Sequence, residues 1–289
     1  MISDNTQQRI KKLKKEYEQL KSGKSALLQL LREAELPELV YNSNAIENST
    51  LTLKETERIL FEQEVMREVS VRELFEAKNL ARVVEYLDTR PDIELTIEMI
   101  LLLHHMLLGG INDGIAGRLR KENEYVRVGS HIAPAPEHLQ QLLDNLLTEY
   151  HSAHDQYFLE NIAHFHAEFE RIHPFCDGNG RIGRVLVNMQ LASAGYPPII
   201  IRNKGKTSDY YPLFQKYQET NEYEGMVDLF SLALQESLHK RLAYLKSLNI
   251  EKLADYSHVN SLAVNAQLNA AKRQTIAAFR EKGIWKIGS

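Results

Sequence analysis

Helical spacing runs through most of this 289-residue chain and leaves little room for a β-sheet. Between Phe158 and Ile172, apolar residues recur at intervals of three and four, which places a buried stripe on one face of a helix. The chain has only 8 prolines, so few points interrupt its helices. Alternating apolar and polar runs, which are typical of half-buried strands, are few. These patterns predict an all-α fold class.

Two segments depart from this helical pattern. Residues 114–138, GIAGRLRKENEYVRVGSHIAPAPEH, contain glycines, two prolines and the β-like stretch YVRVGSHI, which predicts a short β-hairpin flap. From about residue 251 the tail has the rhythm of a helix-turn-helix followed by a wing-like strand. We expect helices at about 6–22, 25–34, 37–48, 53–63, 71–88, 96–108, 137–152, 156–172, 181–194, 207–220 and 224–247.

Composition excludes several classes of protein. A net charge of -4 gives no overall attraction to nucleic acid or to an anionic membrane. The single cysteine, Cys176, excludes an intrachain disulfide and fits a reducing compartment. The polar N-terminus lacks the apolar core of a signal peptide, and no uncharged apolar run reaches the roughly 20 residues that span a bilayer. We expect a cytoplasmic protein with no membrane partner.

The segment from His173 to Arg184, HPFCDGNGRIGR, concentrates the groups that phosphate chemistry needs. Pro174 disfavours helical geometry at His173, which predicts that a helix ends there and leaves the imidazole at a turn, where it can act as a general base. The Gly-Asn-Gly turn at 178–180 predicts an anion-binding nest at the start of the next helix. Arg181 and Arg184 are three residues apart on that helix, and guanidinium groups suit phosphate oxygens.

The same segment resembles the signature of the Fic family, His-Pro-Phe-x-Asp/Glu-Gly-Asn-Gly-Arg-x-x-Arg, and departs from it at no constrained position. The resemblance covers roughly 95–235 and includes the flap. Fic proteins are mostly helical and typically move AMP from Mg·ATP to a Ser, Thr or Tyr hydroxyl of a protein. The resemblance therefore implies a Fic helical bundle, a nucleotidyltransferase activity (protein AMPylation), ATP and Mg²⁺ as cofactors, and a protein substrate, which includes the chain itself as a candidate.

The resemblance also implies a role for each residue of the signature. Related Doc-type kinases carry Ala in place of the first Gly of Gly-Asn-Gly and Lys in place of the second; this chain has neither change, which favours AMP transfer. Phe175 is expected to point into the core and anchor the loop. The implied site residues are His173 as catalytic base, Asp177 as metal ligand, Gly178, Asn179 and Gly180 as anion hole, Arg181 at the inner phosphates and Arg184 at the γ-phosphate.

A second segment, SNAIEN from Ser43 to Asn48, resembles the inhibitory motif of the family, Ser/Thr-x-x-x-Glu-Gly/Asn. Ser43 and Glu47 are four residues apart and therefore share a helix face. The resemblance implies that Glu47 pairs with Arg184 at the γ-phosphate position, so that the protein inhibits itself in cis. Lowering the productive ATP pose by roughly 100-fold requires only about 2.7 kcal/mol.

Two further regions have open alternatives. The flap, with Val128, Gly129, Ser130 and His131, would hold a target segment by main-chain hydrogen bonds, or is an ordinary surface hairpin. Tyr210 and Tyr211 are placed where members of the family wall the adenine, but two tyrosines at a helix start are also common packing residues.

We expect three parts: an N-terminal helical region with the inhibitory motif at 1–94, the Fic domain at 95–235, and a helical, winged-helix-like tail at 236–289. The tail has a modest excess of basic residues, so DNA contact and plain packing or dimerisation as a homodimer both stay open. Two other functions compete with transfer. One is removal of AMP by hydrolysis at the same site, and the other is a DNA- or partner-binding regulator with a nucleotide-sensing site.

Overall fold

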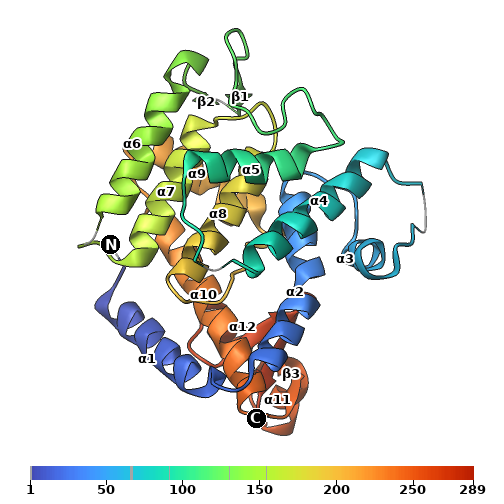
Figure 1. Ribbon diagram of the computed structural model, residues 1–289. Coiled ribbons are helices and arrows are strands. Elements are labelled where there is room, and N and C mark those ends of the chain that lie inside the picture. The colour runs from blue at the N-terminus through green and yellow to red at the C-terminus, as the bar shows by residue number, and fades with distance from the viewer. Residues whose placement is uncertain (1, 66–67, 91, 130, 154) are drawn as a thin grey trace. The chain divides into compact units, whose positions relative to one another are not determined.

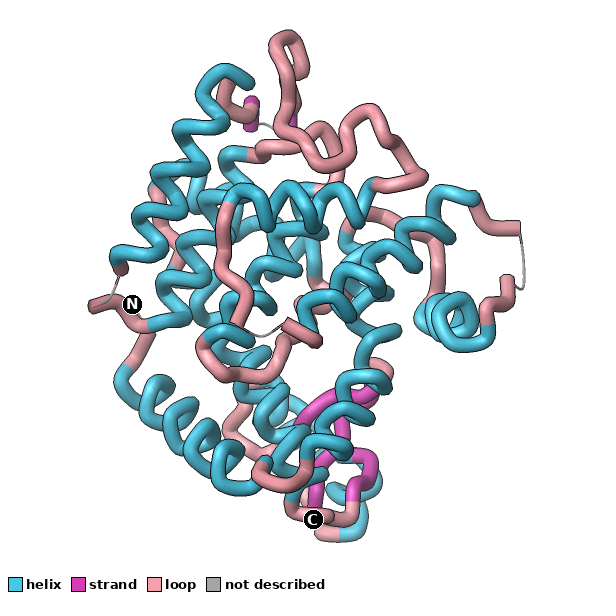
Figure 2. Tube along the Cα trace, viewed as in Figure 1, coloured by secondary structure: helices cyan, strands magenta, loops and turns pink. Residues whose placement is uncertain are grey.

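The computed structural model describes every residue except 1, 66–67, 91, 130 and 154. Helices dominate, and strands occur only in two small sheets among these residues (Figures 1 and 2). The predicted all-α class, with a short hairpin flap, is therefore confirmed. The elements are α1 Asp4–Lys21, α2 Ser25–Ile46, α3 Leu53–Glu57, η1 Arg58–Glu62, α4 Val71–Asp88, α5 Ile97–Leu108, β1 Arg127–Val128, β2 His131–Ile132, η2 Pro136–His138, α6 Leu139–Ser152, α7 Phe158–Ile172, α8 Asn179–Ser193, η3 Lys206–Tyr210, α9 Tyr211–Thr220, α10 Glu224–Leu245, β3 Ile250–Lys252, α11 Leu253–Val259, α12 Val264–Lys272, β4 Ala278–Glu281 and β5 Ile284–Gly288.

The chain forms two compact units, and each is described by itself. The first unit comprises Met1–Glu35, Tyr196–Ile199 and Asp228–Ser289, and the second comprises Leu36–Gly195 and Ile200–Val227. The second unit contains the whole signature segment and the SNAIEN segment. In the part of the chain that the structure describes, every helix is too short or too polar to span a lipid bilayer.

The second unit is a helical bundle built around α7. This helix packs against α6, α8 and α9, and α4 packs against α5 and α8. The predicted stripe of α7 is buried: Phe165, Phe169 and Ile172 have exposures of 1%, 0% and 0%. Burial of these side chains supplies much of the hydrophobic free energy that fixes the end of α7.

The first unit contains the tail, which folds as predicted into two short helices and a wing. Helices α11 and α12 pack on each other, and β4 and β5 form an antiparallel hairpin that β3 extends through β5. Leu253, Ala271 and Ala278 form its small core, and Trp285 packs against that core. This arrangement is that of a winged helix.

Residues 25–46 form one helix, α2, whereas the sequence predicted a break between 34 and 37. Pro37 lies inside α2, where it removes one backbone hydrogen bond. Leu36 and Val40 on its flanks are buried in the core of the second unit, with exposures of 8% and 0%. The predicted break was wrong because burial of the flanking side chains outweighs one lost bond.

Candidate active site

The signature loop begins where α7 ends. As predicted, the helix stops at Ile172, and His173 adopts a left-handed conformation with φ 49°. Its backbone N–H still donates to Phe169 O at 2.9 Å. A residue other than glycine is uncommon in this conformation, and such strain often occurs at functional sites. The turn places the His173 ring beside the helix that it leaves.

Two side chains hold the loop in place. The ring of Phe175 is fully buried and stacks on His104, with ring centroids 3.7 Å apart. The amide of Asn179 accepts from Phe175 N at 2.9 Å and donates to Phe175 O at 2.8 Å. The loop is therefore closed on itself by two bonds and anchored in the core by an aromatic ring.

His104 and Arg120 fix the backbone of the loop from outside. Gly117 N donates to His104 Nδ1 at 3.0 Å, so the proton is on Nε2, which donates to Asp177 O at 3.0 Å. Burial lowers the pKa of His104 to about 4, which keeps this tautomer neutral. Arg120 donates through Nε to His173 O at 2.9 Å. Both residues therefore hold the backbone of the signature loop in place by hydrogen bonds to its carbonyl groups.

The His173 ring is neutral and has a defined tautomer. Its Nδ1 lies 3.3 Å from Glu170 O, which can only accept, so Nδ1 carries the proton and Nε2 keeps its lone pair. Burial is the main reason that the pKa of His173 is lowered to about 4. An imidazole in this state can take a proton through Nε2 at neutral pH.

A buried carboxyl group, that of Glu170, lies behind His173. Its Oε2 is 3.8 Å from His173 Nδ1. Burial, followed by the charge of Glu47, raises the pKa of Glu170 to about 8, so this carboxyl is mostly protonated at pH 7. A Cβ at Gly183 would lie 2.6 Å from Glu170 Oε1, so only glycine at 183 leaves room for this group.

The first two turns of α8 carry the two arginines of the signature. Gly178 precedes the helix with φ 83°, a conformation that favours glycine. Arg181 and Arg184 are buried, with exposures of 3% and 7%. The Asp177 carboxylate accepts from Arg181 Nη2 at 2.9 Å and also pairs with Arg72. Burial raises the pKa of Asp177, but Arg181 and Arg72 lower it by more, so it stays below its usual range.

The SNAIEN segment meets the second arginine of the signature. Arg184 Nη2 lies 2.8 Å from Glu47 Oε1, and Arg184 Nε donates to Ser43 Oγ at 3.0 Å. Asn48 has a φ of 68°, which explains why this position takes Gly or Asn. The structure thus brings Ser43 and Glu47 to Arg184, although they are more than a hundred residues apart in the sequence.

Lys206 and Tyr211 hold the end of α2 beside Glu47. Lys206 Nζ donates to Ala45 O at 2.8 Å and to Asn48 Oδ1 at 2.8 Å. The Tyr211 hydroxyl donates to Ile46 O at 2.5 Å. Because the last carbonyls of a helix have no partner within it, these two side chains stabilise the end that presents Glu47.

The two tyrosines named as adenine walls differ in exposure. Tyr210 is 2% exposed, and its hydroxyl lies 2.8 Å from His166 Nε2. Tyr211 is 39% exposed. Tyr211 is therefore the more accessible of the two, whereas Tyr210 packs inside the protein beside His166.

The flap is a two-stranded antiparallel hairpin. Val128 pairs with His131, and Arg127 pairs with Ile132. His131 Nε2 lies 2.9 Å from Arg171 O, which ties the flap to the end of α7. Gly129 has a φ of 59°, as a tight turn requires, and Ser130 lies outside the described residues.

Asp177 fits the role of a magnesium ligand. Among the described residues, no group of three or more His, Cys, Asp or Glu side chains could hold a metal ion. A single carboxylate nevertheless suits Mg²⁺, because this ion keeps several waters and takes its other ligands from substrate phosphates. Asp177 is 32% exposed and adjoins the N-terminus of α8, where phosphates bind favourably.

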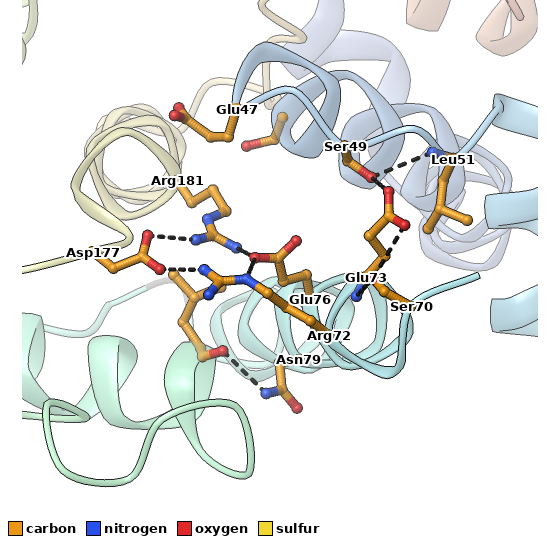
Figure 3. A network of polar contacts seen from close by, with 12 residues as sticks. Glu47, Ser49, Leu51, Ser70, Arg72, Glu73, Glu76, Asn79, Asp177 and Arg181 are labelled. Carbon is orange, nitrogen blue, oxygen red and sulfur yellow. Dashed lines mark hydrogen bonds and ion pairs between the residues drawn. The ribbon is translucent and has the colours of Figure 1, made fainter.

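Sequence reasoning missed five residues that contact the motif: Arg72, Glu76, His104, Arg120 and Glu170. Figure 3 shows Arg72 and Glu76, both from α4, around Asp177 and Arg181. Arg72 and Glu76 are four residues apart, so from sequence they form an ordinary surface pair of a helix. Glu170 precedes His173 by one helical turn, and that spacing was the one signal available for it.

Comparison with known proteins gives a consistent result. The family model described as Fic/DOC family matches residues 94–191. A protein adenylyltransferase Fic from Drosophila willistoni is 36% identical over 193 residues, which cover 65% of this chain and 38% of that protein. Its counterpart from Drosophila melanogaster is 30% identical over 252 residues, which cover 84% and 50%. This chain therefore spans half or less of the length of these relatives. A Fic domain containing signaling protein from Bacteroides thetaiotaomicron has a TM-score of 0.75 at 26% identity, covering 83% of this chain and 97% of that one.

Proposed function

We propose, from the premise that this chain carries a Fic/DOC family domain at residues 94–191, that it transfers AMP from ATP to a hydroxyl group of a protein. The relatives described above are named adenylyltransferases. The observation that supports this most is the position of neutral His173, whose Nε2 keeps its lone pair, in the loop that leads into α8. The N-terminus of α8 brings its backbone N–H groups close to the buried guanidinium groups of Arg181 and Arg184.

In the proposed reaction, Nε2 of His173 takes the proton of the target hydroxyl. The hydroxyl oxygen bonds to the α-phosphorus, the bond to the β-phosphate oxygen breaks, and pyrophosphate leaves. Backbone N–H groups at 178–180 and the guanidinium groups of Arg181 and Arg184 stabilise the developing negative charge. Asp177 would hold Mg²⁺, which supplies Lewis-acid stabilisation of the phosphate oxygens when bound.

Transfer of AMP is favoured over transfer of phosphate. Gly178 and Gly180 both keep the residue typical of adenylyltransferases, whereas the Doc-type kinases that the sequence resembles less closely carry Ala and Lys. A Cβ at 180 would lie 2.3 Å from Glu47 Oε1, so glycine at this position also leaves room for the Glu47 carboxylate.

We further propose that Glu47 inhibits transfer in cis. Its carboxylate lies against Gly180 and pairs with Arg184, at the N-terminus of α8, where an anion is stabilised. A carboxylate here takes the place of a phosphate group. Ser43 supports the same guanidinium through Oγ.

Two supporting roles complete the proposal. The flap would hold the target segment along its strand edge, where Val128 is 43% exposed and Gly129 adds no side chain. Tyr211 would contact the adenine, and its bond to Ile46 O would link nucleotide binding to the end of α2. ATP and a protein substrate, including this chain itself as a candidate, are the partners in this proposal.

A labelling experiment tests the proposed reaction. We expect the Glu47→Gly protein, incubated with Mg²⁺, to retain label from ATP labelled at the α-phosphorus and to retain none from ATP labelled at the γ-phosphorus. The reason is that AMP keeps only the α-phosphorus. Label from the γ-position would indicate a kinase, and label from neither, with ATP still bound in a calorimetric titration, would contradict transfer.

The pKa of His173 gives a second prediction. The imidazole should remain neutral down to acidic pH and take a proton only as the pH falls through about 4, rather than near the ordinary value of 6.5. The measurement is an NMR titration of its ring Cε1–H resonance, assigned by its loss in His173→Ala. Circular dichroism at each pH identifies acid unfolding. A midpoint near 6.5 in the folded protein would show that burial does not hold this ring neutral.

Hydrolytic removal of AMP is a second candidate function. Burial lowers the pKa of His173, and the nearby Glu47 carboxylate acts in the opposite direction. A water molecule held by both groups would have a base on either side. Incubation of AMP-modified protein with wild type and with Glu47→Gly separates the two directions. Release of AMP that depends on Glu47 would support hydrolysis.

Four predictions stay outside this proposal. Neither the relatives nor any contact of the described residues points to DNA binding by the tail or to a homodimer, and the cellular compartment stays an expectation. The division at 94 and 235 also stays a prediction.

A further inference from the structure

Asp177, the proposed metal ligand, belongs to a closed ring of four charged side chains (Figure 3). Arg181 donates to Asp177 Oδ1 at 2.9 Å and lies 2.9 Å from Glu76 Oε1. Arg72 donates to Glu76 Oε1 at 3.0 Å and to Asp177 Oδ2. Two positive and two negative groups therefore balance, and both oxygens of the Asp177 carboxylate are engaged by guanidinium groups.

The two arginines of this ring differ in how easily they can leave Asp177. The side chain of Arg181 is 3% exposed and is held by two carboxylates, so its displacement would leave a buried charge unpaired. The side chain of Arg72 is 55% exposed. If Arg72 releases Asp177, it keeps its bond to Glu76 and gains water. Arg72 is therefore the group that can be exchanged.

The backbone that carries Arg72 is fixed independently of this exchange. Ser70 caps α4 by accepting from Glu73 N at 3.1 Å. Glu73 accepts from Thr50 N at 2.6 Å and from Ser49 Oγ at 3.2 Å. These contacts hold the first turn of α4 in place, so only the side chain of Arg72 needs to move.

We propose that Arg72 is a resident cation at Asp177, which a divalent cation arriving with the nucleotide must displace. A divalent cation needs a lone pair of a carboxylate oxygen. Arg72 donates to Asp177 Oδ2, whereas the buried Arg181 donates to Oδ1. Arg72 thus lowers the affinity of the protein for the cation–nucleotide complex and raises the cation concentration that the site requires. This inference rests on the proposed function, because it takes Asp177 as the ligand of a nucleotide-bound cation.

Calorimetric titration with ADP tests the competition without any transfer. The quantity of interest is the ratio of the ADP affinity with Mg²⁺ to the affinity without it. We expect Arg72→Gln to raise this ratio by about 1.4- to fivefold over wild type, because a half-exposed ion pair contributes roughly 0.2–1 kcal/mol. The rise must come from tighter binding with Mg²⁺. Arg82→Gln, an exposed arginine of the same helix, should leave the ratio unchanged.

A second pair of variants shows whether the effect acts through Asp177. In the Asp177→Asn background, Arg72→Gln should no longer change the ratio, since the carboxylate for which Arg72 and the cation compete is absent. Arg72→Lys, which keeps the charge but loses the planar fork, should lie between wild type and Arg72→Gln.

Three results would overturn the inference. One is an unchanged ratio in Arg72→Gln. Another is a rise that comes only from weaker ADP binding without Mg²⁺, which would make Arg72 a phosphate ligand. The third is a full effect of Arg72→Gln in the Asp177→Asn background. If ADP binds to none of the proteins, the nucleotide site and the proposed function fail together, whereas ADP binding with an unchanged ratio contradicts Arg72 alone.

Discussion

Glu47→Gly should raise the rate of AMP addition about 100-fold over wild type, which corresponds to about 2.7 kcal/mol. The substitution removes the carboxylate that pairs with Arg184 at 2.8 Å, so the guanidinium becomes available to a phosphate group. Charge-assisted hydrogen bonds contribute roughly 1.5–3 kcal/mol, but the Glu47 side chain is 39% exposed and partly screened. The substitution also removes the carboxylate that lies against Gly180, which leaves more room for a phosphate group there. Intact-mass spectrometry over time, with ATP and Mg²⁺, measures the rate.

A matched glycine substitution shows whether the gain is specific. Glu33 is an exposed glutamate of α2, so Glu33→Gly removes a carboxylate from the same helix that carries Ser43, without touching Arg184. Its rate should equal that of wild type. If Glu47→Gly gains nothing over wild type, the proposed inhibition is wrong, although transfer itself can still stand.

His173→Ala, made in the Glu47→Gly background, should lower the rate of AMP addition by about 10²–10⁴-fold. The substitution removes the only nitrogen that we place at the target hydroxyl, while the loop keeps its anchors at Phe175 and Asn179. ATP affinity should change little, because phosphate contacts come from other residues. Initial rates from intact-mass spectrometry, together with calorimetric titration of ATP, separate catalysis from binding.

The control for this loss is a histidine of similar type outside the site. His105 is exposed on α5, next to the buried His104, so His105→Ala should keep the rate of the background protein. A His173→Ala protein that binds ATP and retains the rate to within tenfold would exclude His173 as the general base.

Much of the fold was predictable because its determinants are local. The stripe of α7 and the stop before Pro174 are both properties of a few neighbouring residues, and the structure bears them out. The break expected at Pro37 was wrong because the deciding term, burial of Leu36 and Val40, depends on partners elsewhere in the chain. The π-helical turn η3 before Tyr211 was also missed, since its spacing differs from that of an α-helix by one residue.

The candidate site divides in the same way. The signature is contiguous, so its chemistry could be assigned from one stretch of sequence. The contact of Glu47 with Arg184 was expected only through the family resemblance. Arg72 and Glu76 had no such signal, because the sequence of α4 does not show which face of the helix contacts Asp177 and Arg181. Tertiary packing decides which distant charged residues form ion pairs, and the spacing of neighbouring residues does not predict that packing.

The close approach of Glu47 to Gly180 has an evolutionary consequence. A Cβ at 180 would lie 2.3 Å from Glu47 Oε1, and the carboxylate is the flexible end of its side chain, so the larger residue would expel it and leave the fold intact. A lineage that acquires lysine there would lose the proposed inhibition by Glu47 in the same step. A single substitution at position 180 would thus affect both the proposed inhibition and the group that is transferred. A descendant that changes its reaction in this way would need another means of inhibition.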